Sequence, residues 1–351
     1  MSDPSIDAMV RPSAGSPIEA PRFAIARTTT LIADAARDGR LLGVDVWYPA
    51  ASARADRSVY QLMPGIEFES AAAQPAGPAH GGSFPLVLFS HGRTGMRFSN
   101  SLLCETLAAR GAIVVSADHP GDALADWLLG TYVDDRTNEM GRVADANLLL
   151  DALLKGHPSF APDVTAAIDH NRVVMAGHSY GAYTALATVA GRRGVAPHSA
   201  VKAVVSFQGY TRTLSDAALA RVTLPTLLVV GECDRSTPAS SDADRPWQLL
   251  AGSPTWRADM AGAGHQASSD MGLYADLVDH IPYLPEQVKT FFAETVVDAI
   301  GPGLRPWREL LIEQIGTTWA FLTEVLELHD PDAPAELDQI IASGGLRLQR
   351  R

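Results

Sequence analysis

The chain has 351 residues, 46% of them hydrophobic and 19% charged, so it can bury a large core without disulfides or metals. Its 28 basic side chains against 40 acidic ones give a formal net charge of −12. This balance argues against binding to nucleic acid or to an anionic membrane, because no excess of basic groups is available to meet phosphates. Two cysteines are too few for a disulfide framework, and no apolar run approaches the length that spans a bilayer.

The beginning of the chain shows neither the charged start nor the apolar stretch of a secretory signal, so we expect a cytoplasmic protein. Residues 1–27, which open with a run rich in Ser, Pro and Ala, are predicted to form a flexible arm. Two β-rich runs, at 28–33 and 41–48, flank an Asp-Gly turn at Asp38, which predicts an antiparallel hairpin. Residues 51–84 are rich in Ala, Pro, Gly and Ser and predict a surface insertion.

From residue 85 onward, short apolar runs alternate with helical stretches. The expected buried strands are 86–90, 113–118, 172–177, 201–207 and 224–231, and the helices expected between them are 98–110, 142–154 and 180–190. This alternation is typical of βαβ crossovers, so the predicted fold is α/β: a mainly parallel, doubly wound sheet with the hairpin as its antiparallel N-terminal edge. Helices are also expected at 286–300, 306–328 and 334–343. Because these helices can cover the sheet, residues 28–351 are predicted to form one domain.

The sharpest motif is Gly177-His-Ser-Tyr-Gly181, which follows one predicted strand and opens a predicted helix. A G-x-S-x-G pattern in this setting is typical of a nucleophile elbow, in which a strained turn presents a serine above the sheet. Gly177 and Gly181 provide the room that such a turn needs, and the helix N-terminus favours developing negative charge. Ser179 is therefore the candidate nucleophile. The alternative is a serine that only caps its helix.

A serine nucleophile needs a base and an acid that orients the base. Of the ten histidines, His265 is favoured because it lies in a loop of small residues after a possible strand. Asp234 is favoured as the acid, since it lies between serine and histidine and just after a predicted strand, with Glu232 as its nearest rival. His178 adjoins Ser179, but its side chain is expected to point away from the serine hydroxyl.

Two backbone N–H groups are expected to bind the oxyanion that forms when a carbonyl group is attacked. Tyr180 supplies one as the residue after the nucleophile, and Arg93, in the loop after the first buried strand, is predicted to supply the other. Gly92 lets the backbone approach the site closely. The alternative is that this loop is only a tight turn.

Four short segments, in chain order, resemble the α/β-hydrolase fold: 89–92, 177–181, 231–234 and 264–266. Within that fold the chain resembles the bacterial predicted dienelactone hydrolases and the platelet-activating-factor acetylhydrolase-like esterases, over about residues 28–330. The resemblance implies Ser179 as nucleophile, His265 as base and Asp234 as acid, with the two oxyanion donors named above.

The chain departs from the two families at two positions. Dienelactone hydrolases proper carry a cysteine at the elbow, where this chain has Ser179. In the platelet-activating-factor enzymes the acid follows the preceding strand, and there this chain reads Phe207-Gln-Gly209, with no carboxylate. The acid therefore remains Asp234.

The sequence leaves little room for a cap over the site. Cap domains in this fold usually enter after the strand at 201–207, but only residues 208–223 precede the next strand run. The cleft is therefore expected to be shallow, with walls at 121–140 and 266–286. The candidates for an apolar acyl or alcohol pocket are Trp127, Leu128, Leu129, Tyr132, Leu273 and Tyr274. Simple loop packing is the alternative for these side chains.

These features predict a serine hydrolase that cleaves small-molecule carboxylic esters through an acyl-enzyme, with no metal ion or organic cofactor. The same triad would serve a lipase, a phospholipase A2-like enzyme, or a thioester, lactone or polyester hydrolase, and these alternatives stay open. An acyltransferase and a non-catalytic scaffold of the same fold are the remaining rivals. The sequence indicates no oligomeric state.

Overall fold

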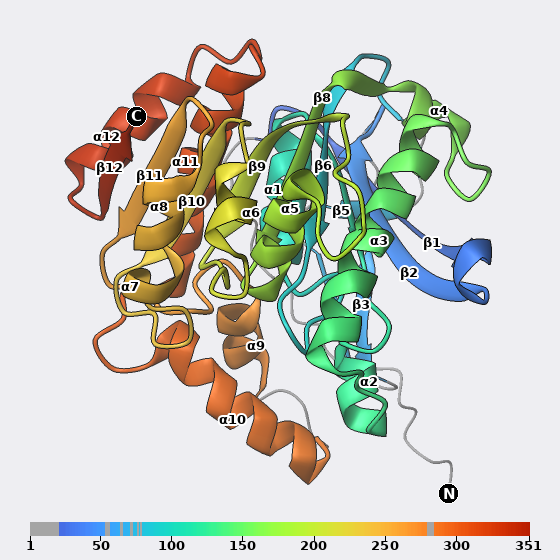
Figure 1. Ribbon diagram of the computed structural model, residues 1–351, viewed down its shortest axis with the longest axis horizontal. Coiled ribbons are helices and arrows are strands. Elements are labelled where there is room, and N and C mark those ends of the chain that lie inside the picture. Colours follow the sequence, from blue (N-terminus) through green and yellow to red (C-terminus); the bar gives the residue numbers. More distant parts are fainter. Residues whose placement is uncertain are drawn as a thin grey trace, which may run out of the picture.

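The computed structural model describes residues 21–52, 57–63, 66–70, 73–75, 77, 79–278 and 284–351. Their main feature is a ten-stranded sheet in the order β12-β11-β10-β9-β8-β6-β7-β2-β1-β5 (Figure 1). The strands are β1 (Ile25–Asp34), β2 (Arg40–Pro49), β5 (Ala73–Pro75), β6 (Phe84–Ser90), β7 (Ile113–Ala117), β8 (Ile168–His178), β9 (Val201–Phe207), β10 (Thr226–Gly231), β11 (Thr255–Met260) and β12 (Leu346–Arg350). A separate pair, β3 (Val59–Met63) and β4 (Ile66–Glu69), forms a two-stranded sheet.

The six central strands, from β7 to β11, are parallel to their neighbours, whereas β1 with β2, β2 with β7 and β11 with β12 are antiparallel. Strands β6, β7 and β10 are buried along their whole length, as expected for strands covered on both faces. The predicted fold class is confirmed: a mainly parallel sheet with an antiparallel hairpin at its N-terminal edge.

Helices cover both faces of the sheet, and the two faces have separate hydrophobic cores. One core receives side chains from α1 (Ser101–Arg110), α11 (Trp307–Val325) and α12 (Ala333–Ala342). The other core receives side chains from α3 (Asp135–Leu154), α5 (Tyr180–Ala190) and α6 (Asp216–Ala220). Shorter elements between the strands are η1 (Ala35–Arg37), α4 (Pro162–Ala166), α7 (Ala239–Asp242) and α8 (Asp244–Leu249). The helices α2 (Leu124–Leu129), α9 (Met271–Leu277) and α10 (Glu286–Ile300) gather at one end of the sheet (Figure 1).

Three parts of the chain differ from the sequence-based expectation. The first strand begins at Ile25, inside the predicted arm of residues 1–27, of which residues 1–20 lie outside the described residues. The strand β12 was not expected, because its Arg-rich sequence shows no apolar run. Leu346, its one buried residue, pairs with Met260 of the neighbouring strand β11.

The segment 51–84 is not a simple surface insertion. Its described part contributes β5 to the sheet edge, and it buries Tyr60 and Phe68 completely. The Tyr60 hydroxyl accepts a hydrogen bond from the Trp47 indole at 2.7 Å and also bonds Glu105 of α1. The Ala, Pro and Gly content of this segment concealed the two aromatic residues that anchor it.

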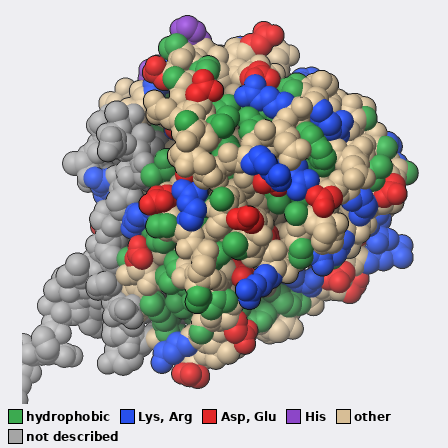
Figure 2. Space-filling model, turned by 90° about the vertical axis from the view of Figure 1, so that its left-hand side faces the viewer, with side chains coloured by type: hydrophobic (Ala, Val, Ile, Leu, Met, Phe, Trp, Pro, Cys, Tyr) green, Lys and Arg blue, Asp and Glu red, His purple; other side chains and the backbone are tan. Residues whose placement is uncertain are grey.

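No helix within the described ranges is long and apolar enough to cross a membrane. On the face shown in Figure 2, Lys and Arg side chains are interspersed with Asp and Glu side chains over the described part of the surface. This mixture fits the acidic overall balance of the sequence.

Candidate active site

Ser179 lies on a sharp turn between β8 and α5, with φ 55° and ψ −117°. A non-glycine residue rarely adopts this left-handed region, so the turn is strained. The two flanking glycines allow it: a Cβ on Gly181 would overlap the carbonyl oxygen of Ser90, and one on Gly177 would overlap the backbone of Gly181. The elbow is therefore pressed against the end of β6 in a way that only glycine permits.

The structure brings Ser179, His265 and Asp234 into one hydrogen-bonded chain. The Nε2 atom of His265 lies 2.9 Å from the Ser179 hydroxyl, and its Nδ1 atom lies 2.9 Å from a carboxylate oxygen of Asp234. Burial opposes ionisation of Asp234, but hydrogen bonds from His265 and Thr237 hold its pKa below the usual value. The carboxylate can thus stay charged and keep the imidazole with its Nδ1 protonated. The rival Glu232 is exposed and accepts a hydrogen bond from the Gly262 N–H instead.

Two further residues support this chain and were not assigned roles from the sequence. Thr237 donates its hydroxyl to Asp234 at 2.6 Å and its backbone N–H to the same carboxylate at 2.8 Å. His178 donates from Nε2 to the carbonyl oxygen of His265 at 2.8 Å. Burial first, and then the neighbouring His265, lower the pKa of His178 to about 3, so this imidazole stays neutral. The only sequence signal for Thr237 is its spacing of three residues after an aspartate, which is typical of side-chain-capped turns.

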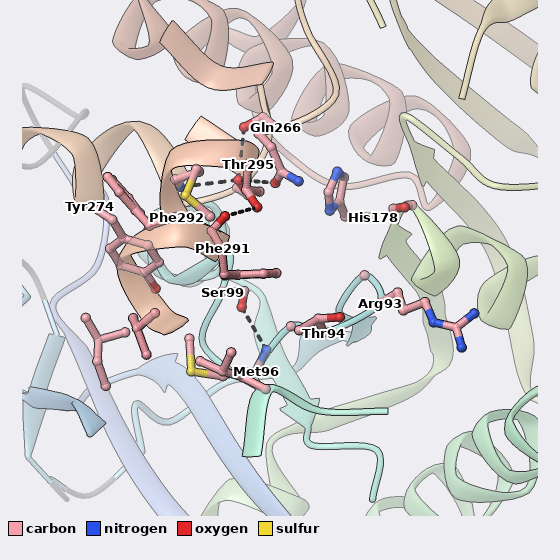
Figure 3. Close-up of a pocket in the computed structure, with 18 of the residues that line it drawn as sticks. Arg93, Thr94, Met96, Ser99, His178, Gln266, Tyr274, Phe291, Phe292 and Thr295 are labelled. Carbon is pink, nitrogen blue, oxygen red and sulfur yellow. Dashed lines mark hydrogen bonds between the residues drawn. The ribbon is translucent and has the colours of Figure 1, made fainter. Parts of the chain in front are cut away.

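The two expected oxyanion donors flank Ser179. A Cβ on Gly92 would lie 3.2 Å from the Cβ of Ser179, so the loop after β6 passes directly beside the serine. The Arg93 side chain points away from the pocket (Figure 3) and pairs with Asp135 at 2.6 Å. Among the described residues, no acceptor is bonded to the Arg93 N–H. Tyr180 is the first residue of α5, where N–H groups have no partner within the helix.

Beside Ser179 lies an apolar cavity of about 250 Å³. One wall is the loop that follows β6, and the opposite wall consists of α9 and α10, which carry Tyr274, Phe291 and Phe292 (Figure 3). The described lining residues are Leu62, Gly92, Arg93, Thr94, Gly95, Met96, Ser99, Leu124, His178, Ser179, His265, Gln266, Ser269, Met271, Tyr274, Val278, Leu284, Val288, Phe291, Phe292 and Thr295. The site is thus a pocket with a helical wall, not the shallow cleft expected from the sequence.

Most of the pocket residues predicted from the sequence lie elsewhere; only Tyr274 is among the lining residues described above. The Trp127 ring contacts the ring of the lining residue Phe291, with 5.0 Å between the ring centroids, and the Tyr132 hydroxyl bonds Thr94. Leu273 is buried in the core that α1, α11 and α12 cover. Leu128 and the largely exposed Leu129 are also absent from the lining. The predicted walls do border the pocket, but mainly through other side chains, such as Leu124 of α2 and Met271 of α9.

Helix α10, which the sequence predicted only as a cover for the sheet, is also joined to the loop of His265. The carbonyl oxygen of Asp298 accepts a hydrogen bond from the Gln266 N–H at 3.1 Å. A Cβ on Gly264 would overlap that carbonyl oxygen, so the helix and the loop are in tight contact. The last turn of α10 thus fixes the backbone beside His265, and residues of the helix from Val288 to Thr295 line the pocket.

Within the described ranges, no group of three or more His, Cys, Asp or Glu side chains is placed to hold a metal ion. The site consists of side-chain and backbone groups that can accept, donate and transfer protons around a serine hydroxyl.

Comparison with known proteins supports the fold. Residues 58–147 match the family model of platelet-activating factor acetylhydrolase, isoform II, which confirms the expected resemblance over that part of the chain. The solved structure of a ferulic acid esterase from Streptomyces cinnamoneus is similar with a TM-score of 0.66 and 21% sequence identity, over 96% of this chain and 99% of that chain. The search of curated proteins gave no match. The chain therefore has the α/β-hydrolase fold.

Proposed function

We propose that the protein is a serine hydrolase that cleaves carboxylic esters through an acyl-enzyme intermediate. The observation that carries the proposal is the chain from Asp234 through His265 to Ser179, with 2.9 Å at each step, placed on a strained elbow beside an apolar cavity. Nucleophile, base and orienting acid are all within hydrogen-bond reach, as this chemistry requires.

The proposed reaction uses only groups of this chain and water. The Ser179 hydroxyl attacks the ester carbonyl carbon while His265 takes its proton, and Asp234 stabilises the imidazolium. The N–H groups of Arg93 and Tyr180 bind the oxyanion of the tetrahedral intermediate. His265 then protonates the leaving alcohol, and a water molecule, activated by the same imidazole, hydrolyses the acyl-enzyme.

The substrate in this proposal is a small-molecule ester with an apolar acyl group. The pocket beside Ser179 is lined mainly by apolar side chains, among them Met96, Phe291 and Phe292. An aromatic acyl group, as in the ester named for the similar ferulic acid esterase, and a short acyl group, as in the acetyl ester named for the matched family, are both compatible with it.

Two further expectations form part of the proposal. A single domain from residue 28 to residue 351 is supported by the one main sheet, whose strands run from Ile25 to Arg350. A cytoplasmic location is supported by Cys104 and Cys233, which are both free thiols, as is usual in a reducing compartment.

The test is turnover of p-nitrophenyl esters from acetate to palmitate, together with methyl ferulate and an sn-2 acetyl phospholipid. A fluorophosphonate probe is then mapped to a peptide. We expect ester turnover, a chain-length optimum set by the cavity, and the label on Ser179. Folded protein that shows no turnover and takes no label would refute the proposal. Labelling of Ser179 without turnover of any of these esters would refute the substrate class and retain the nucleophile.

A further inference from the structure

A fully buried arginine lies under the loop that carries Arg93. Arg142 of α3 is 0% exposed, and its guanidinium group donates to a carboxylate, to two backbone carbonyl oxygens and, at 3.2 Å, to the Ser90 hydroxyl. Its Nε atom donates to the Asp122 carboxylate at 2.8 Å, its Nη1 atom to the carbonyl oxygen of His91 at 2.8 Å, and its Nη2 atom to the carbonyl oxygen of Gly92 at 3.1 Å. The planar fork of an arginine can serve such divergent acceptors at once, and a lysine ammonium cannot.

His91, which is also 0% exposed, contacts the carbonyl group of Gly92 as well. Its Nε2 atom accepts a hydrogen bond from the backbone N–H of His119 at 3.2 Å. Burial, followed by the nearby positive charge of Arg142, holds the pKa of His91 well below its usual value, so the ring is neutral. The single ring proton is therefore on Nδ1, which donates to the carbonyl oxygen of Gly92 at 2.7 Å.

The Gly92 carbonyl oxygen thus receives three donors: His91 Nδ1, Arg142 Nη2 and, at 3.2 Å, the N–H of Gly95. A Cβ on Gly95 would lie 2.8 Å from the His91 Nδ1 atom and 3.0 Å from this oxygen, so the arrangement also requires glycine there. The carbonyl group of Gly92 and the N–H of Arg93 belong to one planar trans peptide and point in opposite directions. Fixing the carbonyl group on the buried side therefore fixes the N–H on the opposite side.

We propose that Arg142 and His91 are positioning residues that hold and polarise the peptide between Gly92 and Arg93, so that the Arg93 N–H is preorganised to bind the oxyanion. This inference rests on the function proposed above. Donors on a carbonyl oxygen withdraw electron density from its peptide and make the N–H at the other end a stronger donor. An N–H that is already oriented needs no reorganisation when the negative charge develops.

A preorganised donor acts on the transition state and not on ground-state binding, so its loss should appear in kcat and not in KM. We expect His91→Leu to lower kcat about 10- to 100-fold and to leave KM within about two-fold. His91→Asn, whose side-chain N–H can take the place of Nδ1–H, should recover most of the activity. Arg142→Lys should lower kcat as His91→Leu does, since it keeps the charge and loses the fork.

The matched control is His119→Leu, because His119 is buried in the same cluster and its side chain bonds Ser90 and Asp145 but not the Gly92 carbonyl oxygen. For each variant we would compare kcat, KM and the inhibition constant of a trifluoromethyl ketone, whose adduct with a serine carries an oxyanion. Melting temperatures would show that each variant is folded.

In folded His91→Leu and Arg142→Lys, inhibition by the ketone should weaken by the same factor as kcat falls. For His119→Leu, kcat and the inhibition constant of the ketone should both stay within about three-fold of the wild-type values. Wild-type values of kcat and of ketone inhibition in folded His91→Leu would overturn the inference. An equal loss in His119→Leu would also overturn it, since the effect would then come from general loosening of the cluster. A wild-type protein without turnover or fluorophosphonate labelling would refute the proposed function, and the positioning role with it.

Discussion

The described part of the chain contains two Ser–His–Asp hydrogen-bond chains of nearly the same dimensions. One is Ser179–His265–Asp234, with 2.9 Å at both steps. The other is Ser90–His119–Asp145, in which Ser90 Oγ lies 2.9 Å from His119 Nε2 and His119 Nδ1 lies 3.0 Å from the Asp145 carboxylate. Distances alone do not tell the two apart.

Their surroundings differ in access and in charge. Ser179 lines a cavity on a strained elbow, whereas Ser90 is 2% exposed at the end of a regular strand. Asp145 is also bonded by Arg37 at 2.6 Å and Arg40 at 2.9 Å. A base must be able to accept a proton. In the buried set, Ser90–His119–Asp145, the surrounding arginines and the lack of solvent oppose a charged imidazole. The two chains therefore differ in whether the serine opens into a cavity and in whether arginines surround the carboxylate, and not in their distances.

The sharpest test of this difference is to remove each serine in turn. Ser179→Ala should lower ester turnover by about 10⁴-fold or more, because no nucleophile remains. Ser90→Ala should leave turnover within a few-fold, because its hydroxyl serves only packing and hydrogen bonding. Steady-state kinetics with matched circular dichroism spectra would measure both. Comparable losses in the two variants would erase the distinction drawn between the sets.

The acid is the next point of comparison. Asp234→Asn should lower kcat by about 10³- to 10⁴-fold, since the amide cannot stabilise the imidazolium. Glu232→Gln, two residues away and exposed, should keep wild-type turnover. Full activity of Asp234→Asn together with an inactive Glu232→Gln would move the acid to the rival position.

The two Ser–His–Asp sets are in contact where Gly181 of the elbow packs against Ser90, and this contact predicts an effect on the free energy of unfolding. A Cβ at Gly181 would overlap the Ser90 carbonyl oxygen, so Gly181→Ala should lower the free energy of unfolding by about 3 kcal/mol or more. Gly141→Ala in α3 is the control: its Cβ would be 3.6 Å from the Arg40 guanidinium, and alanine should be neutral or stabilising there by up to about 1 kcal/mol. Urea unfolding compares the two, and a Gly181→Ala protein as stable as the wild type would show that the elbow can move.

The smallest effect concerns pH. Burial, followed by the charge of Arg142, lowers the pKa of His119 to about 4, whereas the unfolded residue titrates near 6.5. Between these values the unfolded state binds more protons, so the free energy of unfolding should fall as the pH drops from 6.5 to 4.

His119→Gln should therefore lose less stability across this window than the wild type. Urea unfolding at pH 7 and pH 4.5 measures the difference, with His329→Gln, a change at an exposed histidine, as the control. An equal loss in the wild type and in His119→Gln would show that the buried set does not carry the acid sensitivity.

The sequence predicted what is encoded locally. The strands β6 to β11 and the elbow carry short apolar runs and fixed glycine spacings, and their boundaries differ from the expected ones by a few residues. The sequence motifs also singled out Ser179, His265 and Asp234, which the structure brings within hydrogen-bond distance.

What could not be predicted depends on contacts between distant segments. The wall formed by Phe291 and Phe292 follows from how α10 packs on the loops near Ser179, about 110 residues earlier in the chain. Likewise, His91 carries no local sign that Arg142 and the backbone of His119 would fix its tautomer. Tyr60 lies in a short strand of a segment whose Ala, Pro and Gly content predicted a surface insertion, and its partner Glu105 lies 45 residues later in the chain.

The contact between Asp298 and the loop of His265 sets limits on how the pocket can be re-engineered or diversify. Positions in the first half of α10, such as Val288 and Phe291, line the pocket away from this contact, so exchanging them should change the shape of the pocket and leave the contact in place. The last turn of the helix is in tight contact with Gly264, so a change at this contact should move the backbone beside His265 as well as the pocket wall. Under selection for a new specificity, substitutions should therefore accumulate in the first half of α10, and the last turn of the helix should stay unaltered.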